Sequence, residues 1–379
     1  MASHDTIIIG AGIVGAACAH RLARDGKKVL ILDPGPIGAG ATAAGMGHVV
    51  VMDDSDAQFA LTRYSRDLWD QLAPQLPAEA DRITAGTIWV AADADEMAAC
   101  EAKARWYIQR GVHVQVLDAA GLYHHEPNLR PGLAGGLLVG GDSVVYPPVV
   151  AHWLVEQAAA LGAVFRGGVK VRRIEPRAVI LDGGERIAAD VIINAAGAWS
   201  TGLTPGLPIR RRKGHLVITD RYPGFCRHQL IELGYLKNAH ASDADSVSFN
   251  IQPRGTGQML IGSSRQFDPV DEQGHIRPLS ASVDEVMVAK MIRRAAEYMP
   301  GISNLSAIRV WTGFRAATPD SLPIIGKHAQ TEGLWLATGH EGLGITTSLA
   351  TAEILGDLIA GKQPAIAPEP YAPGRAYSH

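Results

Sequence analysis

The amino end of the chain constrains the fold most, because a glycine-rich turn there joins an apolar run to an alanine-rich stretch. Residues 6–9 are continuously apolar, which is typical of a parallel strand buried on both faces. Residues 10–15 form the pattern G-x-G-x-x-G, and residues 16–24 are predicted to be helical. Residues 29–32 are predicted to form a second strand, which ends at Asp33. Together these segments predict one βαβ unit of about 30 residues.

Each glycine of this turn has its own physical role. Gly10 allows the tight turn, Gly12 lets the backbone approach a pyrophosphate, and Gly15 lets helix and strand pack closely. The amino end of the helix presents unpaired N–H groups to phosphates. Asp33 stands where a carboxylate can accept hydrogen bonds from ribose hydroxyls. This context predicts a dinucleotide site, but the motif alone does not separate FAD from NAD.

A loop of small residues follows this unit at positions 38–47, interrupted only by Met46. Small side chains let the backbone wrap closely around a large planar ligand. The alternative is a flexible loop without a ligand.

The rest of the chain predicts two domains that are interleaved in sequence. A length of 379 residues exceeds that of a usual single domain. The predicted fold class is α/β, with a Rossmann-like domain around a parallel sheet and a substrate domain on a mixed, mainly antiparallel sheet. The predicted first domain comprises residues 1–82, 146–207 and 313–379, and the second comprises 83–145 and 208–312.

Several later segments complete the first domain. We predict a helix over 147–161, short strands over 164–165 and 169–171, a hairpin over 179–187 and a buried strand over 190–194.

Composition excludes several classes of protein. The net charge of −3 gives no basic field for nucleic acid. No apolar run is long enough for a membrane span. Cys18, Cys100 and Cys226 are far apart, so no metal site is predicted and a reducing compartment is favoured. We expect a cytoplasmic protein, either free or peripheral to the inner membrane.

Over nearly its whole length the chain resembles the D-amino acid oxidase-like flavoproteins, a family that includes glycine oxidase, sarcosine oxidase and D-amino acid dehydrogenases. The resemblance rests on the turn with Asp33, the loop 38–47, and the segments 194–199, 311–326 and 339–347. It implies FAD as the cofactor. FAD is expected to be non-covalent, because Gly313 stands where some members carry a tethering cysteine.

The resemblance also implies which residues contact FAD. They lie in the glycine turn, after the second strand, in the small-residue loop, beside the adenine, after residue 194, and before the last helix. The implied residues are Gly10, Ala11, Gly12, Ile13, Val14, Gly15, Asp33, Pro34, Ala41, Thr42, Ala43, Gly45, Met46, Gly47, Val169, Ala195, Ala196, Gly197, Trp199, Gly339, His340, Glu341, Gly342, Leu343, Gly344, Ile345 and Thr346.

Arg315 is implied to bind the carboxylate of the substrate. A planar guanidinium pairs with a carboxylate through two parallel hydrogen bonds and fixes its orientation. The alternative is a surface arginine or an ion-pair partner of Asp320.

Other candidate substrate contacts are His340, His48, Tyr235 and Asn250. For His340 the alternative is packing against the flavin without chemistry. For His48 it is a satisfied polar residue behind the ring. Tyr235 is expected on a lid, and Asn250 on a strand that lines the cavity.

Within the family, residues 212–217 and 339–344 resemble the bacterial D-hydroxyproline dehydrogenases. The implied reaction is hydride transfer to flavin N5 from cis-4-hydroxy-D-proline, or from D-proline as a lesser substrate, to give the cyclic imine. Three alternatives stay open: an oxidase for glycine, sarcosine or another small amino acid, a nicotinamide-linked dehydrogenase, and a flavin-carrying subunit of a larger dehydrogenase. The electron acceptor, oxygen or a respiratory or artificial one, and the oligomeric state also stay open.

Overall fold

The computed structural model describes residues 4–234, 245–269 and 277–377. The chain folds into two compact units, each assembled from separate stretches of sequence. The first unit is Met1–Ala80, Tyr146–Arg212 and Phe314–His379, and the second is Asp81–Val145 and Lys213–Gly313. Two long strands, β13 (Arg210–Thr219) and β17 (Ala307–Ala317), run from one unit into the other.

The first unit is built on a six-stranded sheet with the order β18-β19-β12-β1-β2-β8. Neighbouring strands are parallel except β18, which is antiparallel to β19. The inner strands β19, β12, β1 and β2 are mainly apolar and buried, as expected for strands covered on both faces, whereas the edge strand β8 is partly exposed. The strands are β1 (Thr6–Ile9), β2 (Val29–Asp33), β8 (Val164–Gly167), β12 (Val191–Asn194), β18 (Ile324–Lys327) and β19 (Leu334–Thr338).

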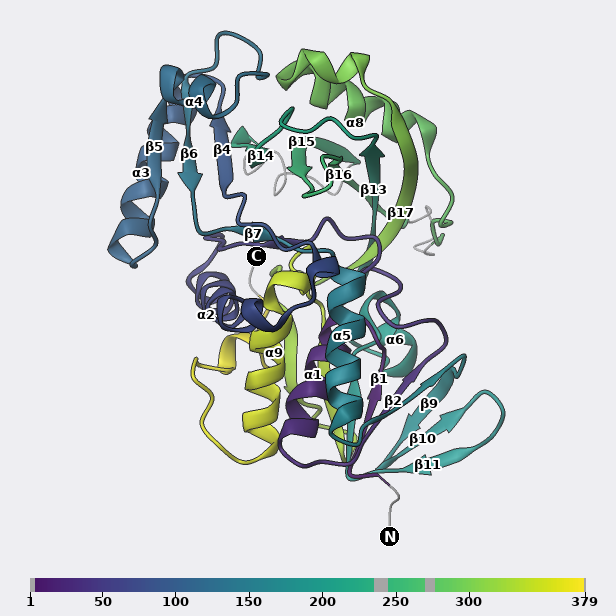
Figure 1. The fold of residues 1–379 in the computed structure, drawn as a ribbon. Helices are drawn as coiled ribbons and strands as arrows, with labels where there is room; N and C mark the ends of the chain where they lie inside the picture. The colour runs from purple at the N-terminus through teal and green to yellow at the C-terminus, as the bar shows by residue number, and fades with distance from the viewer. Residues whose placement is uncertain (1–3, 235–244, 270–276, 378–379) are drawn as a thin grey trace. The chain divides into compact units, whose positions relative to one another are not determined.

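A layer of helices covers one face of this sheet (Figure 1). Helix α1 (Ile13–Arg24) packs against α5 (Pro147–Ala160) and α9 (Gly344–Ile359), and α9 packs against α2 (Asp56–Leu72). The close packing of α1 depends on Gly15, which lies directly over the turn that precedes the helix.

A small antiparallel sheet packs on the other face (Figure 1). It contains β9 (Val171–Glu175), β10 (Ala178–Leu181) and β11 (Arg186–Ala188). Side chains alternate across a strand, so Ile7 and Ile9 of β1 join Val179 and Ile187 in one buried core.

The second unit is built on an eight-stranded sheet with the order β17-β13-β16-β15-β14-β4-β6-β5. The sheet is mixed, since β14 pairs in parallel with β4, whereas the pairs β14–β15, β15–β16, β4–β6 and β5–β6 are antiparallel. Besides β13 and β17, its strands are β4 (Thr87–Ala91), β5 (Gln115–Asp118), β6 (Gly135–Val139), β14 (Gln229–Glu232), β15 (Ser246–Pro253) and β16 (Met259–Phe267).

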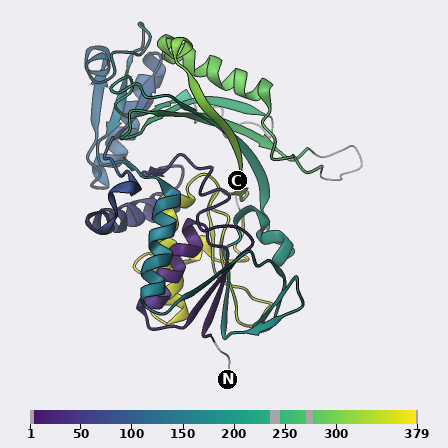
Figure 2. The same ribbon diagram turned by 45° about the vertical axis from the view of Figure 1, so that its right-hand side comes forward.

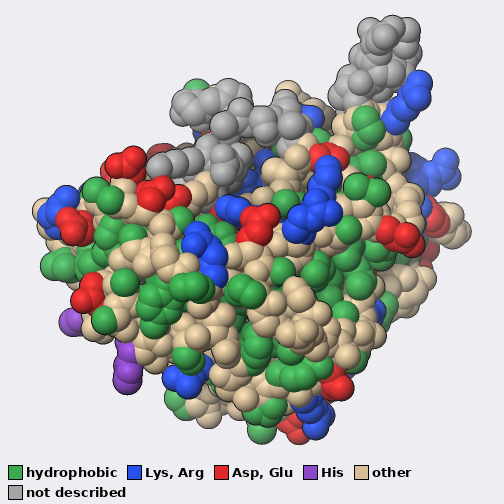
Figure 3. Space-filling view, turned by 90° about the horizontal axis from the view of Figure 1, so that it is seen from above, with side chains coloured by type: hydrophobic (Ala, Val, Ile, Leu, Met, Phe, Trp, Pro, Cys, Tyr) green, Lys and Arg blue, Asp and Glu red, His purple; other side chains and the backbone are tan. Residues whose placement is uncertain are grey.

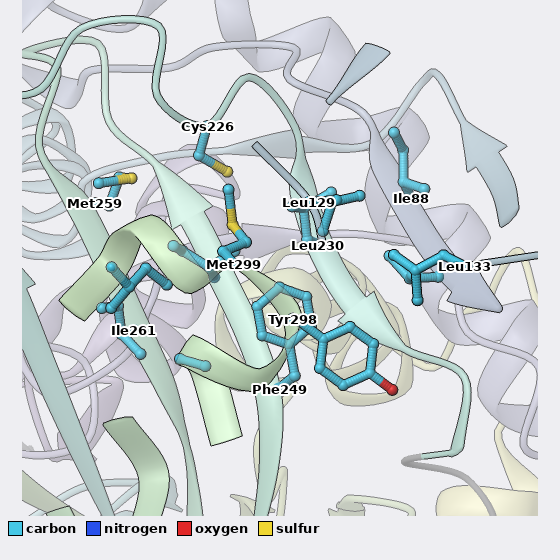
Figure 4. Close-up of a cluster of buried hydrophobic side chains, with 14 of the residues drawn as sticks. Ile88, Leu129, Leu133, Cys226, Leu230, Phe249, Met259, Ile261, Tyr298 and Met299 are labelled. Carbon is cyan, nitrogen blue, oxygen red and sulfur yellow. The ribbon is translucent and has the colours of Figure 1, made fainter. Parts of the chain in front are cut away.

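Helix α8 (Glu285–Tyr298) packs on β15 and β16 and lies along the sheet (Figure 2). The carboxylate of Asp284 caps its amino end by accepting a hydrogen bond from the N–H of Met287. Tyr298 stacks on Phe249 of β15 with ring centroids 4.5 Å apart (Figure 4). These apolar contacts form the core of the second unit.

The remaining helices and strands are short or peripheral. They are β3 (His48–Val49), α3 (Ala94–Gln109), α4 (Ala119–His125), β7 (Ser143–Val144) and α6 (Ser200–Leu203). On the face shown in Figure 3, Lys and Arg side chains lie next to Asp and Glu side chains.

The predicted fold class is confirmed, with local differences. Residues 169 and 170 were predicted as strand, but β9 begins at Val171. The N–H of Val169 instead donates to the carbonyl of Asp33 at 3.0 Å. Helices α2, α3 and α8 were not predicted from the sequence. In α3 the buried face includes Glu96 and Lys103, which weakens the apolar periodicity that marks a helix.

Candidate functional site

The glycine turn folds because each glycine meets backbone that a side chain would strike. A Cβ atom on Gly10 would lie 2.5 Å from the carbonyl oxygen of Ala195, and Gly10 has a φ of +111°. A Cβ atom on Gly15 would lie 1.9 Å from the carbonyl oxygen of Gly10. Real Cβ atoms do not approach so closely, so these two positions require glycine. The turn therefore brings the end of β1 against the segment that follows β12.

Asp33 stands at the end of β2 and organises the backbone around it. One carboxylate oxygen accepts a hydrogen bond from the N–H of Ala11 at 2.7 Å, and the other accepts from Gly35 at 2.7 Å. The carbonyl of Asp33 accepts from Val169. The sequence predicted Ala11, Asp33 and Val169 as cofactor contacts, and the structure brings them together. Pro34 lies beside them and is exposed.

The small-residue loop lies over the amino end of α1. The N–H of Gly38 donates to the carbonyl of Ala11 at 2.8 Å, and the N–H of Ile13 donates to the Thr42 hydroxyl at 2.9 Å. A Cβ atom on Gly12 would lie 3.1 Å from the same hydroxyl. The side chain of Thr42 is buried, whereas Ala41 and Ala43 are exposed.

The same loop reaches the amino end of α9. A Cβ atom on Gly45 would lie 2.7 Å from Cδ1 of Ile345, so the loop backbone packs directly on that side chain. The Thr346 hydroxyl donates to the carbonyl of His48 at 2.9 Å. The indole N–H of Trp69 in α2 donates to the carbonyl of Thr346 at 3.0 Å. One loop thus connects two helix amino ends that lie more than 300 residues apart in the sequence.

The amino end of α9 is well suited to hold negative charge. The helix begins at Gly344, and its N-cap residue Leu343 makes no side-chain capping bond. The first N–H groups of a helix lack partners within it and carry partial positive charge. Gly339 precedes the helix with a φ of +77°, and a Cβ atom there would lie 2.7 Å from Thr318.

The segment after β12 lies beside the end of β19. The amide of Asn194 donates to the carbonyl of Ser200 at 3.1 Å, and its oxygen accepts from Ala196 at 3.2 Å. The Thr338 hydroxyl donates to the carbonyl of Gly197 at 3.1 Å. Trp199 is 52% exposed. The sequence reading placed Ala195, Ala196 and Gly197 beside the cofactor but missed the anchoring role of Asn194, a polar residue that ends an apolar strand.

His340 is packed inside the first unit. Its side chain is 8% exposed, and Nε2 lies 3.0 Å from the Thr351 hydroxyl of α9. Burial lowers the pKa of His340 to about 3, so the ring is neutral at ordinary pH. These contacts favour the packing interpretation of His340 over contact with a substrate.

Arg315 lies near the end of β17 and is half-buried. The carboxylate of Asp320 pairs with Arg375, whose guanidinium donates two hydrogen bonds to it, at 2.7 and 2.9 Å. Burial lowers the pKa of Arg315 to about 10, Glu341 acts to raise it and Arg212 to lower it. The guanidinium therefore keeps its charge at neutral pH. Arg212 was not among the candidate residues predicted from the sequence.

The second unit holds the remaining candidates. Asn250 in β15 is 9% exposed, and its Oδ1 has no hydrogen-bond partner within the described chain. Tyr235 lies outside the described residues.

The residues that the structure describes contain no cluster of His, Cys, Asp and Glu side chains that could hold a metal ion. No helix in this part of the chain is long and apolar enough to cross a bilayer.

Comparison with known proteins shows to which family this chain belongs. The model of the FAD dependent oxidoreductase family matches residues 5–358. A glycine oxidase of Pseudomonas putida is 28% identical over 389 residues, covering 98% of each chain. A D-amino acid dehydrogenase of Xanthobacter autotrophicus is 25% identical, covering 95% of this chain and 96% of the relative. The crystal structure of glycine oxidase from Geobacillus kaustophilus superimposes with a TM-score of 0.88 at 26% identity over the full length of both chains.

The glycine turn, the carboxylate at the end of β2 and the uncapped start of α9 suit a long dinucleotide with two phosphates. The family match excludes the alternative of a nicotinamide-linked dehydrogenase. The chain belongs to the FAD dependent oxidoreductase family, and FAD is its cofactor.

Proposed function

We propose that this protein oxidises the carbon–nitrogen bond of a small amino acid, most specifically cis-4-hydroxy-D-proline, with D-proline as a lesser substrate. The glycine oxidase and D-amino acid dehydrogenase relatives support an amino acid as the substrate class. The finer choice rests on the resemblance of residues 212–217 and 339–344 to D-hydroxyproline dehydrogenases.

The observation that carries the proposal is the placement of Arg315. Its guanidinium is half-buried and charged, while Asp320 pairs with Arg375. Gly342 leaves room beside it, since a Cβ atom there would lie 4.0 Å from Cδ and Nε of Arg315. A charged guanidinium in a partly desolvated place favours a carboxylate ligand. We assign Arg315 to the carboxylate of the substrate.

When bound, FAD would supply the redox chemistry, as the acceptor for hydride from the α-carbon of the amino acid. The residues of the chain contribute binding and orientation. Arg315 would fix the carboxylate and thereby orient the reacting C–H bond. The uncapped start of α9 would stabilise negative charge placed beside it. His340 stays neutral and bonded to Thr351, so no proton transfer is assigned to it.

Anaerobic mixing tests the proposal. Purified protein with bound FAD is mixed with D-proline, L-proline, and the cis and trans isomers of 4-hydroxyproline in both configurations, while the visible absorbance of the flavin is followed. We expect bleaching by cis-4-hydroxy-D-proline at the lowest concentration and the fastest rate. Bleaching by dithionite but by none of these amino acids would contradict the choice of substrate.

Glycine and sarcosine belong to the same experiment, because the glycine oxidase relatives make an oxidase the second candidate. Oxygen consumption compared with reduction of a dye or quinone analogue separates an oxidase from a dehydrogenase. Failure of the isolated chain to reduce a dye with any amino acid, together with activity in a purified complex, would favour a flavin-carrying subunit.

A further inference from the structure

We propose that Glu341, held by Arg212, limits the positive charge beside Arg315 and so makes the site select substrates with one carboxylate over substrates with two. The inference rests on the proposed role of Arg315 as the carboxylate ligand. It concerns specificity within that role and assigns Glu341 a task besides the backbone contact with FAD that the sequence predicted.

Glu341 is fixed in position by its backbone. Its φ of +47° lies in the left-handed region, which residues other than glycine seldom adopt. Its N–H donates to the carbonyl of Ala316 at 2.9 Å, next to Arg315 in β17. This bond ties the loop that carries Glu341 to the strand that carries Arg315.

The side chain of Glu341 is held as well. Its Oε1 forms an ion pair with Nη1 of Arg212, and the two side chains are 14% and 15% exposed. Its Oε2 is buried and has no hydrogen-bond partner within the described chain. A carboxylate in such surroundings keeps much of its field, because little water is present to screen it.

Three charges therefore act together in a poorly hydrated place. Arg315 interacts electrostatically with both Glu341 and Arg212. The charges of these three side chains alone, two guanidinium groups and one carboxylate, sum to one positive unit. Arg211 lies over the ring of Phe314, at 5.1 Å, and Phe314 points to the opposite side of β17 from its neighbour Arg315.

A net charge of one positive unit matches a ligand with one carboxylate. Binding of a monocarboxylate neutralises the group, whereas a second carboxylate on the ligand would bring unmatched negative charge toward Glu341. Juxtaposed like charges with poor hydration suppress the wrong ligand strongly. Removing the charge of Glu341 leaves two positive units, which suits a dicarboxylate.

The test uses Glu341→Gln, which keeps the size of the side chain and removes its charge. Binding of acetate and of malonate to the FAD-loaded protein is measured by calorimetry, so no turnover is needed. We expect the wild-type protein to prefer acetate. In the variant the ratio of the two dissociation constants should shift toward malonate by about tenfold, the size that a modest electrostatic difference produces.

Two further variants separate charge from structure. Arg212→Gln leaves a net charge of zero, so it should weaken the binding of both acids and increase the preference for acetate over malonate. The double variant Arg212→Gln with Glu341→Gln restores one positive unit and should return the ratio to near its wild-type value. A purely structural role predicts no such recovery.

Glu185→Gln is the matched control. Glu185 pairs with Arg166 on the surface of the first unit, at 2.8 Å, so this change removes one negative charge far from Arg315 in sequence and in an exposed place. In Glu185→Gln the ratio of the dissociation constants for acetate and malonate should equal that of the wild type. Retention of the visible flavin spectrum checks that each variant is folded.

An unchanged ratio in a folded Glu341→Gln protein overturns the inference and leaves the proposed function intact. If that variant loses FAD, an unchanged ratio in Arg212→Gln overturns it equally. Failure of the wild-type protein to bind either acid would instead remove the role assigned to Arg315, and the inference with it.

Discussion

The hydroxyl of Thr42 accepts a hydrogen bond from the N–H of Ile13 at 2.9 Å, across 29 positions of the sequence. This bond closes the small-residue loop over the first turn of α1, where the glycine turn predicts the pyrophosphate. The loop therefore has a defined conformation beside the predicted cofactor site, and the alternative of a flexible loop is not supported.

Thr42→Val should weaken FAD binding. The change keeps the shape of the side chain but removes the acceptor of the Ile13 N–H, and a buried N–H without a partner costs about 1–3 kcal/mol. Thr42→Ser keeps the hydroxyl and serves as the control. Titration of apoprotein with FAD, followed by flavin fluorescence, measures both. Equal affinities for the Val and Ser variants would show that the bond does not contribute.

Gly15→Ala should prevent formation of the cofactor site. The new Cβ atom would lie 1.9 Å from the carbonyl oxygen of Gly10, so α1 or the turn must move. Gly202→Ala is the control, since a Cβ atom there meets nothing within 4 Å. We expect loss of bound flavin and a lower melting temperature in the first variant only. Normal flavin content in Gly15→Ala would contradict the packing described for this turn.

FAD should be released when the protein is denatured with acid. Gly313 replaces the cysteine that tethers flavin in some family members, and Cys18, Cys100 and Cys226 are all buried. Acid precipitation should leave yellow supernatant and colourless pellet. A yellow pellet would point to a covalent bond, with His48 as the first residue to examine by mass spectrometry.

The parts of the fold that were readable from sequence depend on local patterns. The apolar runs of β1 and β2 and the glycine spacing between them lie within about 30 residues, so they predict a βαβ unit directly. Helix α2 had a usable signal that was missed: Ser55 caps it, and Leu61, Ser65 and Trp69 recur on its buried face.

The contacts of the site depend instead on residues far apart in sequence. The pairing of Arg375 with Asp320 joins positions 55 residues apart, and that of Arg212 with Glu341 joins positions 129 apart. No local sequence pattern predicts which arginine forms an ion pair with which carboxylate. The sequence therefore indicated Arg315 as important but could not show that Glu341 and Arg212 act on its charge.

Arg315→Ala should abolish most of the catalytic efficiency. Removing one member of a poorly hydrated charge pair typically costs about 2–5 kcal/mol. We expect the ratio of kcat/KM values of wild type and variant to correspond to a loss of transition-state stabilisation of that size, with bound FAD unchanged. Arg315→Lys should recover only part of it, because an ammonium cannot form the two parallel hydrogen bonds of a guanidinium. Arg309→Ala, an exposed position in the same strand, is the control. Full activity in Arg315→Ala would remove the central assignment.

The burial of His340 predicts how stability depends on pH. Its pKa is lowered from an ordinary 6.5 to about 3 in the folded protein, because the buried ring cannot be hydrated. Between these two values the unfolded chain binds a proton that the folded chain does not. The stability contributed by the neutral ring is therefore present above pH 6.5 and is lost progressively as the pH falls toward 3. At pH 5 the loss is about 2 kcal/mol.

His340→Gln should reduce this acid sensitivity, although the variant will be less stable at pH 7.5 because the packing around Thr351 changes. Urea unfolding at pH 7.5 and at pH 5 measures the difference for each protein. His20, whose pKa burial also lowers, to about 4, keeps part of the effect in the variant. His152→Gln is the control, since His152 lies exposed on α5 and pairs with Glu156. A fall in the free energy of unfolding that is equal in the wild type and in His340→Gln from pH 7.5 to pH 5 would mean that His340 takes up its proton in the folded protein. The buried, neutral state assigned to it would then be wrong.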